Sequence, residues 1–349
     1  MRAVWVGRAG GLEALVDAAL PLPAPGPGQV RVRVVCAGFN PVDAAWRRGE
    51  HLPPLPGVLG RDFSGVVDAV GEALDPRAPR FEVGDAVLGY AGRASNGTYA
   101  EHLCLPVELL GAKPEHLGFE HAAALPVAWL TATRIRSELG PMDPELDDVF
   151  VTGASGAVGS LLIEVLRGEG LAVSATTSSD PGARHLRALG VAPERIVRVD
   201  RGGPEDWARA AKARVGPATH LVDLAGGALK NLCFALAPVD GDVLSVVEEP
   251  PDFSLNLWDE RTSPLVRRSL RFAFVQLGST LLIDQPARWS GYGRGVGRAA
   301  EAAAQGRLST YLSGVSSVGP LGAEAARAAH RKLESGAVRG KLVMRVSDP

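Results

Sequence analysis

The chain has 349 residues, of which 37 are Lys or Arg and 39 are Asp or Glu, so its net charge is close to zero. The basic residues are scattered without a run or stripe, and we therefore expect no nucleic-acid partner. A chain of this length exceeds one typical small domain and predicts two domains around two cores.

Three cysteines, Cys36, Cys104 and Cys233, stand at wide spacings with no CxxC pair. Such a set fits reduced thiols better than a disulfide framework, and we interpret the three as small buried hydrophobic residues. The N-terminal MRAVWVGRAGG has charge and glycine where a signal peptide needs an apolar stretch, and no window approaches the roughly 20 apolar residues of a membrane span. We expect a soluble, cytoplasmic protein with no membrane partner.

The first part of the chain and the middle part have different patterns. Up to about residue 125, short β-rich runs separated by Pro and Gly predict a compact, mostly antiparallel β domain, with strands at 30–35, 65–70 and 86–90. From residue 147, apolar strands alternate with helical stretches, which is typical of a parallel sheet covered by helices. The expected strands are 149–152, 172–176, 220–224 and 243–247, and the expected helices are 157–167, 182–189 and 227–236.

The last part of the chain predicts helices at 297–305 and 323–335, a mobile Gly-rich loop at 290–297 and a closing strand at 341–346. A closing strand needs a sheet to join. The simplest arrangement is that the chain leaves the first domain, builds the second and returns to complete the first.

The strongest motif is VFVTGASGAVGSLLIEVL, in which an apolar strand leads into Gly153, Gly156 and Gly159 and then into a helix. In this context the glycines give a tight turn, a close approach of backbone to pyrophosphate, and close packing of helix on sheet. The free N–H groups of the first helical residues, Ala157 and Val158, would face the phosphates. The motif predicts a dinucleotide site; the alternative is that the glycines only make a tight turn.

The choice of cofactor is set at the end of the next strand, where an NAD site usually has an acidic residue. Here that strand ends in Thr177, Ser178 and Ser179, whose hydroxyls can donate to a 2′-phosphate, and Arg184 is the nearest cation. Asp180 follows shortly after. We favour NADPH over NADH; the alternative is that these residues only end a strand and begin a turn.

Seven segments occur in order along nearly the whole chain: AGFNPVDAAWRRG, LPGVLGRDFSGVVDAVG, FEVGDAVLGY, GTYAEHLCLP, AAALPVAWLTA, VTGASGAVG and GKLVMRV. Together they resemble the quinone oxidoreductase branch of the medium-chain dehydrogenase/reductases. The resemblance implies an α/β protein with a GroES-like β-barrel catalytic domain, residues 1–126 and 287–349, and a doubly wound Rossmann domain, residues 127–286. It also implies a homodimer paired through Rossmann edge strands, for which 269–277 is the candidate.

The resemblance also bears on metal binding, because zinc-dependent members of this superfamily need a Cys and a His at the catalytic metal and a four-Cys structural lobe. In this chain Asn40 stands where that Cys would be, and Arg61 and Asp62 stand where a His-Glu pair would be. Three cysteines cannot form the structural lobe. We therefore expect no metal.

Without a metal to polarise a carbonyl, reduction is easiest where the acceptor is conjugated, because hydride added at the β-carbon gives a delocalised enolate. This favours a small-molecule quinone or α,β-unsaturated carbonyl as substrate. Asn40 is the best candidate for an amide that contacts the substrate; the alternative is that it stabilises the turn before Pro41. Asp43, Arg61 and Asp62 are either functional residues near the cleft or members of a structural ion-pair network.

The proton donor is not assigned by the sequence. Relatives that use a tyrosine near the Asn-Pro motif have it at about the position of Ala45, which cannot donate a proton, and Gly182 stands where relatives often have a Lys beyond the Ser pair. Tyr90 is a candidate for the pocket, with packing as the alternative, and water is another proton source. By resemblance Thr131 lies beside the cofactor; the alternative is a helix-packing threonine.

Other functions share some of these sequence features. Short-chain dehydrogenases have similar TGASG turns but need a Tyr-x-x-x-Lys base, and the two downstream tyrosines, Tyr292 and Tyr311, have valine four positions later. A catalytically idle nucleotide-binding protein, supported by Ala45, stays open, as does an enoyl reductase that acts on a carrier-bound thioester. We expect 250–257 and 277–283 to border the nicotinamide side of the pocket.

Overall fold

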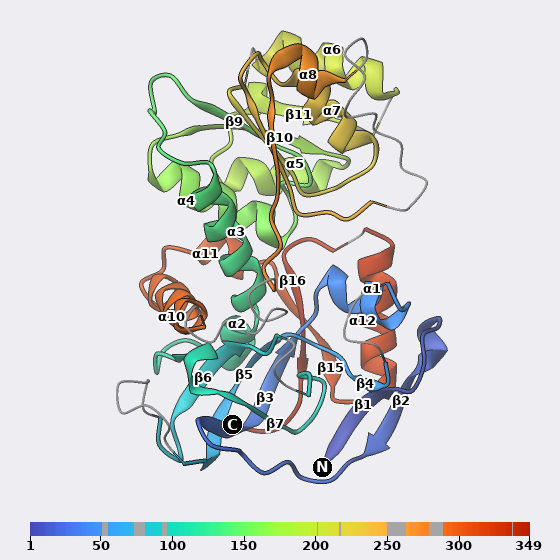
Figure 1. The fold of residues 1–349 in the computed structure, drawn as a ribbon, viewed down its shortest axis with the longest axis vertical. Helices are drawn as coiled ribbons and strands as arrows, with labels where there is room; N and C mark the ends of the chain where they lie inside the picture. Colours follow the sequence, from blue (N-terminus) through green and yellow to red (C-terminus); the bar gives the residue numbers. More distant parts are fainter. Residues whose placement is uncertain are drawn as a thin grey trace. The chain divides into compact units, whose positions relative to one another are not determined.

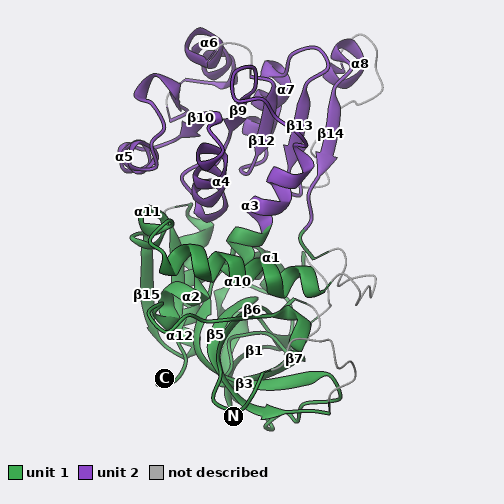
Figure 2. Ribbon diagram, turned by 90° about the vertical axis from the view of Figure 1, so that its left-hand side faces the viewer, with its two compact units in different colours: residues 1–130, 277–349 green, residues 131–276 purple. Residues whose placement is uncertain are grey.

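The computed structural model describes residues 1–50, 55–72, 81–92, 96–200, 202–215, 218–249, 263–278, 289–336 and 338–349. These residues form two compact units, Met1–Leu130 with Leu277–Pro349 and Thr131–Gln276 (Figures 1 and 2). The units divide at 130/131 and 276/277, whereas the limits predicted from the sequence are 126/127 and 286/287. None of the described helices combines the length and the apolar character that crossing a bilayer requires.

The first unit is built on two β-sheets. One is antiparallel with the order β2-β1-β4, and the other has the order β15-β16-β3-β5-β6-β8 with β7 also paired to β3. Burial alternates along β3, where Val30, Val32 and Val34 are buried and the arginines between them are not, as the period of a strand requires. The strands are β1 Arg2–Val6, β2 Leu15–Ala19, β3 Gln29–Gly38, β4 Gly57–Val58, β5 Asp62–Val70, β6 Ala86–Tyr90, β7 His102–Pro106, β8 Leu110–Ala112, β15 Val315–Pro320 and β16 Lys341–Arg345.

The closing strand expected from the sequence is β16, and it joins the same sheet as β3. Both β5 and β16 run antiparallel to β3, with Gly38 near the end of β3 paired to Asp62 on one side and to Val343 on the other. Antiparallel neighbours begin where the strand between them ends. The first residues of β5 and β16 therefore lie beside the residues that follow β3.

The helices of the first unit correct one expectation. The Gly-rich segment 290–297 was expected to be a mobile loop, but it forms the first half of α10. A Cβ atom on Gly293 would lie 2.4 Å from the carbonyl oxygen of Glu108, and one on Gly295 would lie 2.6 Å from the Leu130 side chain, so glycine permits close packing that outweighs its poor helix propensity. The helices and 3₁₀ turns are η1 Leu12–Ala14, α1 Pro41–Arg47, η2 Val107–Leu109, α2 Phe119–Ala123, α10 Ser290–Ala304, α11 Ser309–Leu312 and α12 Ala323–Glu334.

The second unit has a parallel six-stranded sheet in the order β11-β10-β9-β12-β13-β14. This confirms the α/β class, and it is the doubly wound order in which the strand sequence reverses between β9 and β12. Phe150, Leu221 and Val243 from the strands pack with Leu232 and Phe234 of α7 in its core. The strands are β9 Asp148–Val151, β10 Ala172–Thr177, β11 Ile196–Arg198, β12 His220–Asp223, β13 Asp242–Ser245 and β14 Arg271–Phe274.

The three helices expected in this unit are α4, α5 and α7, whose bounds agree with the prediction to within a few residues, whereas α6 and α8 were not predicted. Helix α3 spans the division between the units. The helices and the 3₁₀ turn are α3 Pro126–Glu138, α4 Ala157–Gly168, α5 Asp180–Ala188, η3 Pro193–Arg195, α6 Pro204–Val215, α7 Ala228–Leu236 and α8 Pro264–Arg268. The expected edge strand 269–277 is the shorter β14, which does lie at the edge of the sheet. Segments 250–257 and 279–283, expected near the nicotinamide, lie outside the described residues.

Candidate functional site

The Gly-rich turn between β9 and α4 has the backbone geometry that the sequence predicted for it. Gly153 has a φ of +63°, which glycine adopts far more readily than other residues. A Cβ atom on Gly159 would lie 2.5 Å from a backbone carbonyl oxygen of the turn, so only glycine lets the helix pack this closely. Gly156 precedes α4 in extended conformation, and the N–H groups of Ala157 and Val158 in the first turn have no carbonyl partner within the helix.

A buried network that the sequence analysis missed lies at the carboxyl ends of β9, β12 and β13. The carboxylate of Asp223 accepts hydrogen bonds from Thr152 Oγ1 at 2.9 Å, from Ser245 Oγ at 2.8 Å and from the N–H of Gly226 at 2.9 Å. Lys230 Nζ lies 3.9 Å from the same carboxylate. The network holds the loop after β12 beside the Gly-rich turn, and only the strand register relates these positions to one another.

The hydroxyl residues at the end of β10 have different environments. Thr177 is buried, Ser178 is exposed, and Ser179 caps α5 by accepting a hydrogen bond from the N–H of Gly182 at 3.2 Å. A Cβ atom on Gly182 would lie 2.2 Å from Thr177 Oγ1. The lysine that relatives often have at this position is therefore incompatible with the local packing here.

Two arginines belong to this end of the sheet. Arg184 is exposed on α5. Arg198 on the neighbouring strand β11 was not predicted from the sequence. It is paired in register with Thr177 of β10, and its guanidinium group binds the carboxylates of Asp180 and Asp200. The carboxylate of Asp180, which would repel a phosphate, is thus paired with a cation.

In the first unit, Asn40, Asp62 and Lys341 form a hydrogen-bonded cluster in which each residue is at most 4% exposed. Lys341 Nζ donates to Asn40 Oδ1 and to Asp62 Oδ2, both at 2.6 Å, and Asn40 Nδ2 donates to the same Asp62 oxygen at 3.0 Å. The other Asp62 oxygen accepts from the N–H of Val127 at 2.7 Å. Lys341 was not predicted as a site residue. The one sequence feature that could have indicated it is a lysine at the start of an otherwise apolar strand.

Asp43 lies next to this cluster and links it to Arg61. The Asp43 carboxylate accepts from the N–H of Asn40 at 2.8 Å and from the hydroxyl of Tyr99 at 3.1 Å, and Arg61 Nε lies 4.0 Å from its other oxygen. Burial raises the pKa of Asp43 to about 6, and the Arg61 guanidinium opposes this shift. The Arg61 side chain also lies over the ring of Trp46 at 5.3 Å.

Tyr90 ends β6, where it is paired in register with Asp62. It is 3% exposed, and its ring centroid lies 5.7 Å from that of Tyr292. Burial raises the pKa of the Tyr90 hydroxyl, and Arg61 opposes this shift. The structure therefore brings together all four residues predicted to be catalytic, Asn40, Asp43, Arg61 and Tyr90. Thr131 is buried in α3, and its contact with a cofactor stays a prediction.

The cluster around Asn40 does not suit a zinc ion. Zinc in proteins is held by thiolates, imidazoles and carboxylates. Here the position that a metal-binding Cys would occupy bears an amide, and the neighbouring carboxylate of Asp62 is already neutralised by the Lys341 ammonium. Within the part of the chain that the structure describes, no three His, Cys, Asp or Glu side chains gather as a metal site.

The thiols are poor nucleophiles in this fold. Cys36 and Cys233 are buried, and Cys104 is half-buried. Burial raises the pKa of the Cys36 thiol to about 12 and raises the pKa of the other two. The interpretation as small buried residues is confirmed for Cys36 and Cys233.

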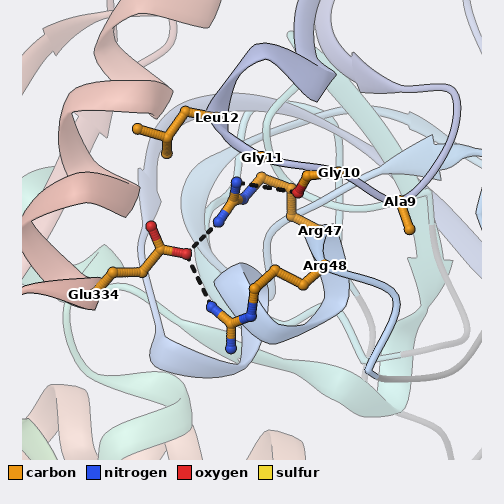
Figure 3. A pocket seen from close by; sticks show the side chains of 7 residues that line it. All are labelled: Ala9, Gly10, Gly11, Leu12, Arg47, Arg48 and Glu334. Carbon is orange, nitrogen blue, oxygen red and sulfur yellow. Dashed lines mark hydrogen bonds and ion pairs between the residues drawn. The ribbon is translucent and has the colours of Figure 1, made fainter.

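A separate cavity of about 490 Å³ lies in the first unit, and none of the predicted site residues lines it (Figure 3). Figure 3 shows Arg47 and Arg48 of the α1 region directed at Glu334 of α12, with which both form ion pairs. Arg47 is 2% exposed and also donates to the carbonyl oxygen of Gly10 at 3.2 Å. These contacts join α1 to a helix close to the end of the chain. The lining residues are Ala9, Gly10, Gly11, Leu12, Arg47, Arg48 and Glu334.

Comparisons with known proteins cover both units. Residues 26–130 match the alcohol dehydrogenase GroES-like domain, and residues 192–344 match the family described as zinc-binding dehydrogenase. Quinone oxidoreductase of Mus musculus is 33% identical over 53% of this chain and 54% of its own length, and an NADPH-dependent alkenal/one oxidoreductase of Arabidopsis thaliana is 34% identical over 52% and 48%. The match spans about half the length of these curated relatives. A solved NAD-dependent alcohol dehydrogenase is 30% identical over 99% of this chain and 100% of its own, with a TM-score of 0.78.

Proposed function

Since the chain belongs to the medium-chain dehydrogenase/reductase superfamily, we propose that it is an NADPH-dependent, zinc-independent oxidoreductase that transfers hydride to a small quinone or α,β-unsaturated carbonyl. The observation that carries the proposal is the Gly-rich turn at the point where the strand order of the parallel sheet reverses. Ligands bind at such switch points in doubly wound folds. The similarity to proteins named quinone oxidoreductase and alkenal/one oxidoreductase supports the choice of acceptor.

The residues of the second unit would hold the cofactor, which supplies the hydride when it is bound. The N–H groups of Ala157 and Val158 are suited to the pyrophosphate, because a helix N-terminus attracts anions. Ser178 and Ser179 can donate to a 2′-phosphate, and Arg184 supplies an exposed positive charge near them. This set supports NADPH over NADH.

The residues of the first unit would act on the acceptor. Asn40 is suited to donate a hydrogen bond to the acceptor oxygen, where negative charge develops during conjugate reduction. Two buried cations, Arg61 and Lys341, balance the two buried carboxylates of Asp43 and Asp62, so the cluster can stabilise added negative charge without a metal ion. Zinc independence is supported by this donor set.

A single assay tests the proposal. Purified, metal-stripped protein is mixed with NADPH or NADH and with a small quinone, a simple enone or an enoyl-coenzyme A thioester, and loss of reduced-nicotinamide absorbance is followed. We expect turnover of quinone or enone that prefers NADPH and needs no metal. A requirement for added zinc overturns zinc independence; turnover of the thioester alone assigns an enoyl-thioester reductase; nucleotide binding without any turnover assigns an idle binding protein.

Replacing Arg184 tests the cofactor preference. Arg184→Met is expected to raise the KM for NADPH about tenfold and to leave the KM for NADH unchanged, because only NADPH has the 2′-phosphate that a charge-assisted hydrogen bond would hold. Arg187 is also exposed on α5, so Arg187→Met is the matched control and should change neither value. Equal effects of Arg184→Met on the two cofactors would contradict the assignment.

We also propose a homodimer formed through β14. This strand is the edge of the parallel sheet, and Phe274 on it is 44% exposed. An edge strand presents unpaired backbone groups to a second chain. Light scattering of the purified protein at micromolar concentration measures the mass, and a monomer would contradict the proposal.

A further inference from the structure

Lys341 reaches Asn40 through the register of the sheet. The two residues are 301 positions apart, but β16 begins beside the end of β3, where the N–H of Phe39 donates to the carbonyl oxygen of Leu342 at 3.0 Å. Asp62 begins β5 on the opposite side of β3. Asn40, just beyond β3, therefore lies between a cation and an anion that come from its two neighbouring strands.

Among the described residues, the hydrogen bonds of the Asn40 amide leave one donor position unused. Its Oδ1 accepts from the Lys341 ammonium, and one N–H of Nδ2 is directed at Asp62 Oδ2. An asparagine amide has two N–H donors. With the oxygen bound to the ammonium and one N–H bound to the carboxylate, the amide cannot rotate by half a turn without placing its NH₂ group against Lys341.

We propose that Lys341 is a positioning residue, which orients and polarises the Asn40 amide so that its second N–H is the donor for the oxygen of the acceptor. The inference rests on the proposed function and adds to it the residue that sets the orientation of the amide. An ammonium on the amide oxygen strengthens the N–H donors of the same group, because hydrogen bonds in a chain polarise one another. Without it, the amide can present its oxygen to the acceptor, which would repel the developing charge.

A double-mutant cycle on kcat tests whether Lys341 acts through Asn40. Asn40→Ala is expected to lower kcat about 100-fold, as loss of an oxyanion donor does, and Lys341→Met about tenfold. Asn40→Ala/Lys341→Met should match Asn40→Ala to within about twofold, since the amide that Lys341 orients is already gone. The KM for NADPH should stay constant in all three variants. Effects that multiply in the double variant would overturn the proposal.

Lys341→Met leaves the Asp62 carboxylate buried without its cation, which strongly destabilises a fold, so a charge-neutral variant is needed. Asp62→Asn/Lys341→Met removes both charges and keeps an acceptor for Asn40 Nδ2. We expect it to have a kcat at least as low as that of Lys341→Met. A kcat equal to that of the unmodified protein would overturn the positioning role.

A measurement independent of activity separates this proposal from the proposed function. The chain has four asparagines, so protein labelled with ¹⁵N-asparagine gives four side-chain amide signals, and Asn40→Ala identifies the pair that belongs to Asn40. Asp62→Asn/Lys341→Met has a fifth asparagine at position 62, so its spectrum is compared with that of Asp62→Asn, which has the same five asparagines. Between these two variants the Asn40 pair should shift while the pairs of the other three original asparagines stay in place, and an unmoved Asn40 pair overturns the proposal. If the unmodified protein turns over no acceptor, the proposed function fails, and the amide signal still decides whether Lys341 positions Asn40.

Discussion

Asp62→Asn is expected to lower the free energy of unfolding by about 3–5 kcal/mol, the cost typical of breaking a buried ion pair from one side. Asp62 is fully buried, and its carboxylate is the only anionic group described within 3 Å of the Lys341 ammonium. The substituted amide keeps the size of the side chain but cannot balance that charge. Urea unfolding at neutral pH, followed by tryptophan fluorescence, measures the change.

Two variants control this result. Asp68→Asn changes a carboxylate on the same strand that is only partly buried and lies beside Arg31 and His102, so we expect a loss of less than about 1 kcal/mol. Asp62→Asn/Lys341→Met, which removes both charges, should regain part of the stability lost in Asp62→Asn. If Asp62→Asn and Asp68→Asn have the same stability, the ion pair with Lys341 contributes little to the fold.

His330→Phe is expected to make the protein less sensitive to acid. His330 lies on α12, is fully buried against the rings of Phe39 and Tyr99, and neither ring nitrogen has a hydrogen-bond partner among the described residues. Burial, with a further contribution from Arg47 and Arg48, lowers the pKa of His330 from 6.5 to about 3. The folded protein therefore holds this imidazole neutral.

The sign of the effect follows from proton binding. Between pH 6.5 and pH 3 the unfolded chain protonates His330 and the folded chain does not, so stability falls as the pH falls below 6.5. At pH 4.5 this amounts to about 3 kcal/mol. Asp43, with its pKa raised to about 6, has the opposite effect, since the folded state binds its proton more tightly than the unfolded state.

Because the unmodified protein and His330→Phe both contain Asp43, the difference between their stabilities reports the contribution of His330 alone. The unfolding free energies of the unmodified protein and His330→Phe are measured at pH 7.5 and at pH 4.5, and the difference between the two proteins should change by about 3 kcal/mol in favour of the variant at low pH. His116→Phe, at an exposed histidine, is the control and should show no such change. A difference that is the same at both pH values would show that His330 does not remain neutral in the folded state.

Local patterns in the sequence determined much of the second unit. The strand, Gly-rich turn and helix around Gly153 are contiguous. Gly153 is favoured by its own positive φ and Gly159 by its close approach to Ala154, so the motif alone predicted both the turn and its geometry. The alternation of apolar strands with helices likewise predicted a parallel sheet. The candidate residues Asn40, Asp43, Arg61 and Tyr90 were also named from the sequence, because they lie in or beside segments that resemble a known family.

The tertiary structure decided which distant residues complete these sites. Lys341 reaches Asn40, Arg198 reaches Thr177 and Asp223 reaches Thr152 through strand pairing, and no spacing along the chain specifies which residues two paired strands bring together. The glycines in α10 are another example. Their low helix propensity predicted a loop, but in the folded protein they pack closely against Glu108 and Leu130, which only a residue without a side chain allows. The sequence by itself therefore determined the local elements and the dinucleotide turn, whereas strand register and packing determined the charged partners of the buried site residues, because those contacts exist only after the sheets have formed.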